Sequence, residues 1–368
     1  MPYTTDNRIV MTLDAGGTNF VFSAARAGEE IIAPISLPAR ASTLEQSLQT
    51  IRTGFEQVKS QLSEQPVAIS FAFPGPADYP NGIIGDLKNL PTFRGGVALG
   101  PMLEYHFGIP TFINNDGDLF VYGEAIAGLL PAINKELETA GNPKRFRNLF
   151  GITLGTGFGG GLVVDGRLFL GDNSAGAEIW AMRSKLHPHA YAEEGVAIRA
   201  VRRVYAQEAG IPFEEAPEPR VICSIAKGEE QGNADAAREA WRQLAVNAGD
   251  ALANAVTLLD ALVVIGGGLA GASELILPHL VNEMNNPLGN IQGEPLCRTE
   301  LVAFNLEDIT QKAAFLKGQA KTIPIPGTSL TISYDPLQRT GVGVSRLGTS
   351  RAVSIGAYAF ALSKLDSV

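Results

Sequence analysis

The chain has 368 residues, a net charge of −9 and 2 cysteines. This length allows two domains of ordinary size, and a content of 45% apolar and 18% charged residues is typical of a globular α/β protein. The basic residues are dispersed, which argues against a nucleic-acid partner because phosphate-backbone binding needs a concentrated basic surface. Cys223 and Cys297 are too few for a disulfide framework and too far apart in sequence for a structural zinc motif.

The sequence gives no sign of a membrane segment. Its start, MPYTTDNRIV, has neither a basic n-region nor an apolar h-region, and the glycine-interrupted stretch 262–272 is too short to cross a bilayer. We therefore expect a cytoplasmic protein that has no membrane partner.

Two turns rich in glycine and threonine, each between apolar strand-like runs, are the most informative features. The first is LDAGGTN (13–19) and the second is LGTGFGGG (154–161). Glycine lets backbone N–H groups point at an oxyanion without a Cβ in the way. Asp14 ends the first strand, where a carboxylate can hold a hydrated Mg2+ near phosphates. One such turn is common in proteins that bind no phosphate, but the pair predicts two contacts to one nucleotide.

The pattern differs from a Walker-type loop. No Gly-Lys-Ser/Thr follows either glycine cluster, and the strands lead into strands instead of a helix. A bound nucleotide would therefore have to be held in some way other than by a Walker-type loop.

The elements after the first turn place polar residues at strand ends. Apolar spacing predicts a helix over 42–62, and 67–73 is a buried-strand candidate that ends in Pro74-Gly75-Pro76. A strand over 111–113 ends at Asn114-Asn115-Asp116, and a helix is expected over 117–130. Ligands of open α/β sheets bind at the carboxyl ends of strands.

The second half repeats this plan. Hairpins are expected around Thr156 and at Asp165-Gly166, the latter with a type I′ turn. The expected helices and strands are a helix over 194–209, a helix over 235–259, a buried strand over 261–265, a helix from about 273, strands over 301–304 and 330–334, and a helix over 352–365. Gly266-Gly267-Gly268 by itself fits a close-packing turn better than a nucleotide contact. The stretch 287–346 is expected to be largely irregular.

Asp116 is the candidate catalytic residue. A carboxylate within hydrogen-bond reach can accept the proton of a substrate hydroxyl during phosphoryl transfer. Asn115 offers a donor and an acceptor, which suits the neighbouring hydroxyls of a sugar. The same Asn-Asn-Asp-Gly run equally fits a turn or a helix cap.

These motifs, in this order, resemble the ROK family of sugar kinases and sugar-responsive repressors, within the actin, sugar kinase and heat-shock chaperone superfamily. The resemblance spans nearly the whole chain. It implies two ribonuclease-H-like lobes of the actin-like ATPase class, with ATP and sugar in the cleft between them. It also implies transfer of the γ-phosphoryl group of ATP, with Mg2+, to the 6-hydroxyl of a glucose-type hexose or N-acetylhexosamine. We expect lobes over 1–115, joined by the helix 352–368, and over 116–351, in a homo-oligomer, with a dimer as the expected state.

The resemblance assigns roles to individual residues. Asp116 is the implied base, and Asp14 the implied indirect ligand of Mg2+. The implied sugar-binding residues are Gly75, Asn89, Asn115, Asp116, Glu178 and Glu194, with Glu193 as the alternative to Glu194. The implied ATP-binding residues are Gly16, Gly17, Thr18, Asn19, Thr156, Gly157, Gly267, Gly268 and Leu269.

The chain departs from the family pattern in one segment. The family usually reads Gly-Glu-Ile-Gly-His followed by a Cys-rich zinc motif, whereas this chain reads Ala177-Glu178-Ile179-Trp180-Ala181 and no zinc cysteines follow. The sugar-binding Glu is kept, the His is replaced by Ala181, and zinc is therefore expected to be absent. Asn19 likewise stands where Lys or Arg is common.

Two competing functions remain. A non-catalytic, sugar-sensing regulator of the same family is the first, although family repressors carry an N-terminal helix-turn-helix domain and the first strand here is expected from about residue 8. A sugar-independent ATPase or chaperone-like clamp is the second, and it would leave Asn115, Asp116 and Glu178 without a shared purpose.

Overall fold

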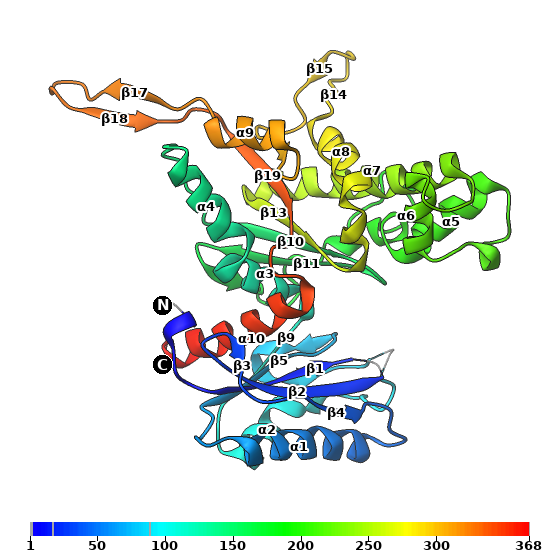
Figure 1. Cartoon of the computed structure of the whole chain (residues 1–368), viewed down its shortest axis with the longest axis vertical. Coiled ribbons are helices and arrows are strands. Elements are labelled where there is room, and N and C mark those ends of the chain that lie inside the picture. Colours follow the sequence, from blue (N-terminus) through cyan, green and yellow to red (C-terminus); the bar gives the residue numbers. More distant parts are fainter. Residues whose placement is uncertain (1–2, 17, 88–89, 368) are drawn as a thin grey trace. The chain divides into compact units, whose positions relative to one another are not determined.

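The structure, a computed structural model, describes residues 3–16, 18–87 and 90–367. The chain divides into two compact units (Figure 1). The first unit comprises residues 1–127, 168–176 and 349–368, and the second comprises 128–167 and 177–348. Each unit is built around a six-stranded sheet with helices packed on it, so the expected α/β class is confirmed.

The first unit has the strand order β3-β2-β1-β5-β9, and β4 also pairs with β2. The bounds are β1 Val10–Ala15, β2 Asn19–Arg26, β3 Glu29–Glu30, β4 Ile35–Pro38, β5 Ala68–Ala72 and β9 Thr111–Asn114. β1 and β2 form an antiparallel hairpin, while β1, β5 and β9 run parallel. The first turn therefore leads from strand to strand, as the sequence predicts.

Helices cover both faces of this sheet. On one face, α1 (Leu44–Gln61) and α2 (Leu99–Phe107) enclose a phenylalanine-rich core in which Phe55 contacts Phe22, Phe71 and Phe107. On the other face lies α10 (Thr349–Leu365), which packs against α3 (Asp116–Ala127) (Figure 1). The expected lobe boundary at 115/116 would place α3 and α10 in different lobes. The division of the chain at that point stays a prediction.

Short elements complete the first unit. They are η1 Tyr3–Thr5, β6 Ala77–Asp78, η2 Tyr79–Asn81, β7 Ile83–Ile84 and β8 Val97–Ala98, where η marks a 3-10 helix. β6, β7 and β8 form a small separate sheet that follows the Pro-Gly-Pro loop.

The second unit repeats the strand order of the first. Its sheet runs β12-β11-β10-β13-β19-β16, with β10 and β11 as the antiparallel hairpin and β13, β19 and β16 running parallel to β10. The bounds are β10 Leu149–Leu154, β11 Phe158–Val164, β12 Arg167–Phe169, β13 Leu262–Gly266, β16 Val302–Asn305 and β19 Arg339–Val344. Asp165 and Gly166 both have positive φ, of 50° and 77°, which confirms the expected type I′ turn.

Several helices contribute to the hydrophobic core beside the second sheet. They are α5 Ile198–Ala209, α6 Pro219–Lys227, α7 Ala234–Leu259 and α8 Ser273–Asn285. Their shared core with the sheet contains Ile152, Trp241 and Leu280. The remaining helical elements are α4 Leu129–Thr139, α9 Ile309–Lys317, η3 Ile179–Ala181, η4 Ala192–Gly195, η5 Phe213–Glu215 and η6 Gly268–Ala272.

Three sequence-based expectations about elements are wrong. The helix expected over 117–130 ends at Ala127, because Gly128 leaves the helical conformation before α4 begins. The helix expected from Glu194 begins at Ile198, since residues 192–195 form a 3-10 turn. The stretch 287–346 contains its two expected strands, as Val302–Asn305 and Thr331–Tyr334, but it also contains α9 and β19, which were not expected.

That stretch contains two projecting hairpins and a central strand. The hairpins are β14 (Leu288–Gly289) with β15 (Pro295–Leu296), and β17 (Lys321–Pro324) with β18 (Thr331–Tyr334), and both extend from the second unit (Figure 1). The central strand β19 reads Arg-Thr-Gly-Val-Gly-Val, whose glycines hide the strand signal from propensity arguments. In the described part of the chain, none of the helices combines the length and apolar character needed to span a bilayer.

A buried ion pair holds this stretch to the sheet. Arg339 Nη1 lies 2.7 Å from Asp335 Oδ2, and neither side chain is more than 1% exposed. Asn142 Nδ2 donates to the same oxygen at 2.8 Å, and the amide of Gln319 donates to Oδ1 at 3.0 Å. Burial alone would raise the pKa of Asp335, but these donors outweigh it and lower that pKa to about 2. Because the folded pKa lies below the unfolded value, the carboxylate stabilises the fold above about pH 4 and loses this effect as pH falls toward 2.

Replacing Asp335→Asn should destabilise the protein at pH 7 by about 3 kcal/mol, because Arg339 would stay buried without its counter-charge. Urea unfolding at pH 7 measures the loss, and the difference from wild type should shrink as pH approaches 2. Asp165→Asn, at an exposed carboxylate, is the matched control. Equal stability of Asp335→Asn and wild type at pH 7 would contradict the assignment.

Candidate functional site

The carboxyl ends of the parallel strands in the first unit bring three predicted site residues to one sheet edge. Asp14 in β1 is in register with Ala72 in β5, which is in register with Asn114 in β9. Asn115 and Asp116 follow directly after β9. The predicted placement of polar residues at strand ends is therefore confirmed for Asp14, Asn115 and Asp116.

Asp116 is the first residue of α3, and its Oδ1 accepts the Gly117 N–H at 2.8 Å. Its side chain is exposed to water, yet the protein around the carboxyl group removes enough hydration to raise the pKa above the ordinary value. The Gly117 amide opposes this rise, and the negative charge of Asp14 adds to it. The result is an accessible carboxylate that is more basic than a free aspartate.

Asn115 caps α3, so the helix-cap interpretation of Asn-Asn-Asp-Gly is also correct. Its Oδ1 accepts the Gly117 N–H at 2.7 Å, and its carbonyl accepts the Leu119 N–H at 3.1 Å. The side-chain oxygen is thus occupied, and Nδ2 has no partner among the residues that the structure describes. Asn115 can therefore offer a ligand a donor more readily than an acceptor.

Two neighbouring loops are anchored by the aromatic core. The Tyr79 hydroxyl donates to the Phe73 carbonyl at 3.0 Å, which fixes the loop around Gly75. In the following loop, 86–95, the Gly95 N–H donates to Asp86 Oδ1 at 2.7 Å. The ring of Phe93 in this loop packs on Phe73. Asn89, a predicted sugar ligand in this loop, lies outside the described residues.

The first turn is only partly described. Gly16 and Thr18 lie between β1 and β2, and Asn19 is the first residue of β2. The Thr18 carbonyl accepts the Ala39 N–H at 2.9 Å. Gly17, the remaining predicted phosphate contact here, lies outside the described residues.

The second turn, residues 155–157 between β10 and β11, leaves two amides unpaired. The Gly155 N–H donates to the Gly157 carbonyl at 3.0 Å, and the Gly155 carbonyl accepts the Ile198 N–H at 2.8 Å. The N–H groups of Thr156 and Gly157 have no partner within the described ranges of the chain. Adjacent free amides in a turn are the arrangement that binds an oxyanion.

Glu193 holds the far end of this turn. Its Oε2 accepts the Phe158 N–H at 3.0 Å, and its Oε1 pairs with Arg199 at 2.8 Å. Arg199 also donates to the Thr156 carbonyl at 3.3 Å. Sequence reasoning gave Glu193 only a secondary role and missed Arg199. Both are long-range partners of the turn, so no local pattern indicates them.

Glu194, a predicted sugar ligand, has both carboxylate oxygens engaged. Oε1 lies 2.6 Å from Arg199 and Oε2 lies 3.3 Å from Arg203. The Arg199 hydrogen bond is the main reason that the pKa of Glu194 is below its ordinary value. A sugar-binding role for Glu194 stays a prediction, and it would require the residue to exchange these partners.

The loop 177–181, which carries Glu178, packs on the strand that follows the second turn. A Cβ at Gly160 in β11 would lie 2.3 Å from the Ala177 carbonyl oxygen, so only glycine permits this approach. Ala177 adopts φ 63°, a left-handed conformation that costs a non-glycine residue free energy. Ile179 is buried in the core and anchors the loop, which leaves Glu178 exposed beside it.

The glycine run after β13 meets the end of β10. A Cβ at Gly267 would lie 2.3 Å from the Leu154 carbonyl oxygen, and Gly267 has φ 86°. Gly268 and Leu269 then line a cavity of about 460 Å3 in the second unit, opposite α6 and Trp241. This volume is in the range of small-molecule sites. The structure thus brings Thr156, Gly157, Gly267, Gly268 and Leu269 into one region of this unit.

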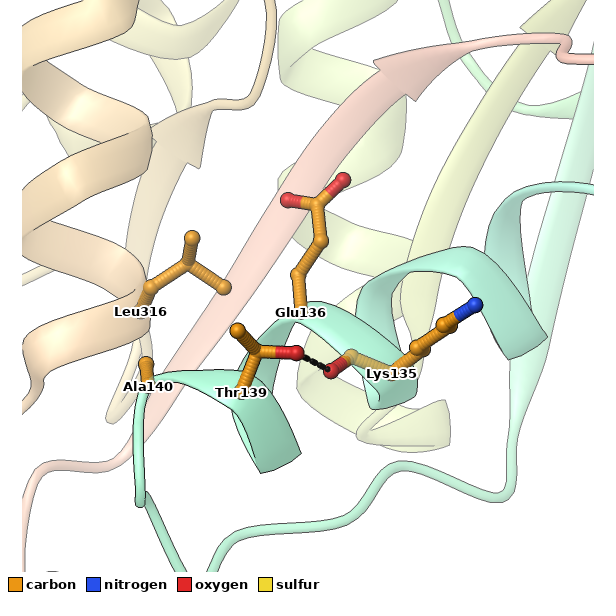
Figure 2. Close-up of a pocket in the computed structure, with 5 residues that line it drawn as sticks. All are labelled: Lys135, Glu136, Thr139, Ala140 and Leu316. Carbon is orange, nitrogen blue, oxygen red and sulfur yellow. Dashed lines mark hydrogen bonds between the residues drawn. The ribbon is translucent and has the colours of Figure 1, made fainter.

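A second cavity, of about 370 Å3, contains none of the predicted site residues. The cavity is lined by residues of α4, by Ala140 directly after α4, and by Leu316 of α9 (Figure 2). Glu136 in this cavity pairs with Lys312 at 2.7 Å, which satisfies its charge within the protein. We assign no ligand to it.

Metal ligands do not cluster in the residues that the structure describes: no group of three or more His, Cys, Asp or Glu side chains is placed to hold an ion. The absence of zinc stays a prediction from the sequence. Asp14 remains a candidate for contact with Mg2+ through water.

Replacing Glu193→Ala should weaken binding of ADP about tenfold, because the second turn would lose a charged hydrogen-bond partner. Calorimetric titration with Mg-ADP measures this. Glu193→Gln, which keeps an acceptor for the Phe158 amide, should lose less, and Glu208→Ala, an exposed carboxylate on α5, is the control. Unchanged or tighter binding by Glu193→Ala would show that this carboxylate does not support an anion site.

Several known proteins are similar to this chain in sequence or structure. The chain aligns with a glucokinase structure from Parabacteroides distasonis at 53% identity and a TM-score of 0.92, over 99% of both chains. An N-acetyl-D-glucosamine kinase from Vibrio cholerae is 29% identical over 46% of this chain, and the chain spans about half (51%) of that relative. A ROK family glucokinase from Streptomyces griseus, in complex with glucose and AMPPNP, is 17% identical with a TM-score of 0.58 over 95% and 98% of the two chains, and shows the fold alone.

The match to a family model settles the classification. The model described as the ROK family covers residues 10–311, which include both turns, Asp116 and the glycine run after β13. The solved relatives have the two-lobed, actin-like ATPase fold that the sequence predicts. The chain therefore belongs to the ROK family.

Proposed function

We propose that the chain is an ATP-dependent sugar kinase that transfers the γ-phosphoryl group to the 6-hydroxyl of a hexose. The observation that carries the proposal is the pair of unpaired amides at Thr156 and Gly157, together with an accessible, more basic Asp116. The names of the 53% identical glucokinase and of the N-acetylglucosamine kinase support glucose or an N-acetylated hexosamine as the acceptor.

Asp116 is assigned the role of general base. Phosphoryl transfer is driven mainly by positioning and charge neutralisation, and a carboxylate near the attacking hydroxyl accepts its proton. The raised pKa of Asp116 makes it a better proton acceptor than an ordinary aspartate while it remains ionised. Asn115 would donate from Nδ2 to a neighbouring sugar hydroxyl.

The nucleotide is assigned mainly to the second unit. The free N–H groups of Thr156 and Gly157 would hold phosphate oxygens, and the cavity beside Gly268 and Leu269 would hold the nucleoside. Gly16, Thr18 and Asn19 in the first turn would contact the terminal phosphates, with Asp14 holding the hydration shell of Mg2+. Mg2+ would neutralise charge on the transferred group.

Glu178 is the favoured sugar ligand of the second unit. It is exposed, and no arginine or lysine pairs with it in the described part of the structure, in contrast to Glu194. Its carboxylate can therefore accept hydrogen bonds from sugar hydroxyls without first breaking an ion pair. Gly75 and Asn89 stay predicted contacts on the loops of the first unit.

A coupled assay for ADP release tests the function directly. With Mg-ATP, glucose or an N-acetylated hexosamine should stimulate turnover far above the rate without sugar, and the product should be the 6-phosphate. Mannose and fructose complete the panel. Binding of a hexose without turnover would favour a regulatory member of the family, and ATP hydrolysis unaffected by any hexose would favour a sugar-independent ATPase.

Replacing Asp116→Asn should lower kcat on the order of a hundredfold or more with hexose binding retained, because the amide cannot accept the proton. Single-turnover rates and calorimetry separate the two effects. In wild type, activity should fall on the acid side as Asp116 gains a proton, at a pH above the ordinary aspartate pKa of 3.8. Asp235→Asn, with a side chain 94% exposed on α7, is the control. Near-native kcat in Asp116→Asn would remove Asp116 from the base role.

A further inference from the structure

The loop 177–181 presents an exposed aromatic side chain beside Glu178. Trp180 is 38% exposed although tryptophan is usually highly buried, and its ring meets that of Tyr191 in an edge-on contact at 5.4 Å between centroids. Tyr191 is itself 58% exposed. Two large aromatic rings thus remain in contact with each other and with solvent on one face of the second unit.

The polar edge of Trp180 is directed at the carboxylate. The indole N–H donates to Glu178 Oε2, which leaves Oε1 without a partner among the described side chains. Hydrogen bonds to an ionised acceptor are roughly twice as strong as neutral ones and restrict its orientation. Trp180 therefore fixes the direction in which Glu178 can receive a ligand.

The backbone around this pair is held on both sides. The left-handed Ala177 and the buried Ile179 fix the start of the loop, and the Ala192 N–H donates to the Met182 carbonyl at 2.6 Å. Arg183 and Tyr191 form an isolated β-bridge. Because both chain segments are tied together, the Trp180–Tyr191 pair is a preformed surface that does not need to be assembled by a ligand.

The chemistry of this surface fits a pyranose. A hexose ring has C–H groups on its faces and hydroxyl groups around its edge, so it can contact an apolar ring and a carboxylate at the same time. Trp and Tyr combine an apolar body with a polar tip, and ligand sites pair aromatic walls with a few placed polar groups. The side chain of Ala181, next in the chain, has no donor to compete for the Glu178 carboxylate.

We propose that Trp180 positions the Glu178 carboxylate and, with Tyr191, forms the aromatic wall on which the hexose ring lies. This inference rests on the proposed sugar kinase function. It makes Trp180 a positioning residue and a determinant of hexose affinity, while the transfer of the phosphoryl group stays with Asp116.

Intrinsic fluorescence gives a direct test, because the chain has 2 tryptophans and the other, Trp241, is only 1% exposed. Titrating wild type with its preferred hexose should change the emission in a saturable way. Trp180→Phe should lose this signal, since the remaining indole lies in the core. It should also raise the hexose KM about tenfold, with kcat within about twofold, because the ring is kept and only the charged hydrogen bond is lost.

Trp180→Ala, which removes both the donor and the ring, should raise KM further. Tyr105→Ala, at a 95% exposed aromatic residue in the first unit, is the control for loss of an exposed ring. If Trp180→Ala fails to fold in a thermal melt, the wild-type emission and Trp180→Phe still decide the outcome.

The inference is overturned if wild type phosphorylates a hexose but its emission does not respond, or if Trp180→Phe and Trp180→Ala keep the wild-type KM. A fall in kcat without a change in KM would also overturn it. Failure of the underlying function looks different: wild type would then show no hexose-stimulated turnover at all.

Discussion

A backbone amide that binds an anion must have no partner within the protein, and the turn that carries it must therefore be held by other groups. The turn between β10 and β11 meets both conditions. Thr156 and Gly157 keep free N–H groups within the described chain, while Glu193 holds the Phe158 amide and the Gly155 carbonyl accepts from Ile198. The ion pair of Glu193 with Arg199 then keeps this carboxylate's charge balanced close to the proposed phosphates.

The repeated strand order gives each unit an equivalent hairpin followed by parallel strands. In the first unit the strand ends carry carboxylates, Asp14 and Asp116, and in the second unit they carry glycines, Gly266 to Gly268. The same framework thus bears different residues, and the proposed function assigns metal and proton chemistry to the first unit and most nucleotide contacts to the second.

Local patterns predicted the strands that border the candidate site (β1, β2, β5, β9, β10, β11 and β13), both hairpin turns and the strand-end position of Asp116, because apolar runs and glycine placement determine these features within a few residues. They did not predict Arg199 or the main role of Glu193, since the partners of these residues are up to 43 positions away in sequence. The helix expected from Glu194 failed locally: residues 192–195 form a 3-10 turn, and Glu193 and Glu194 pair with Arg199 of the helix that follows. The strand β19 was missed because it is recognisable only from its neighbours β13 and β16.

The most direct test of this account is a crystal structure of the protein with a hexose and a nonhydrolysable ATP analogue. The account predicts a carboxylate oxygen of Asp116 within about 2.6–3.2 Å of the hexose 6-hydroxyl. It also predicts phosphate oxygens on the Thr156 and Gly157 amides. A complex in which the 6-hydroxyl lies away from Asp116, or in which these amides face solvent while the phosphates bind elsewhere, would contradict it.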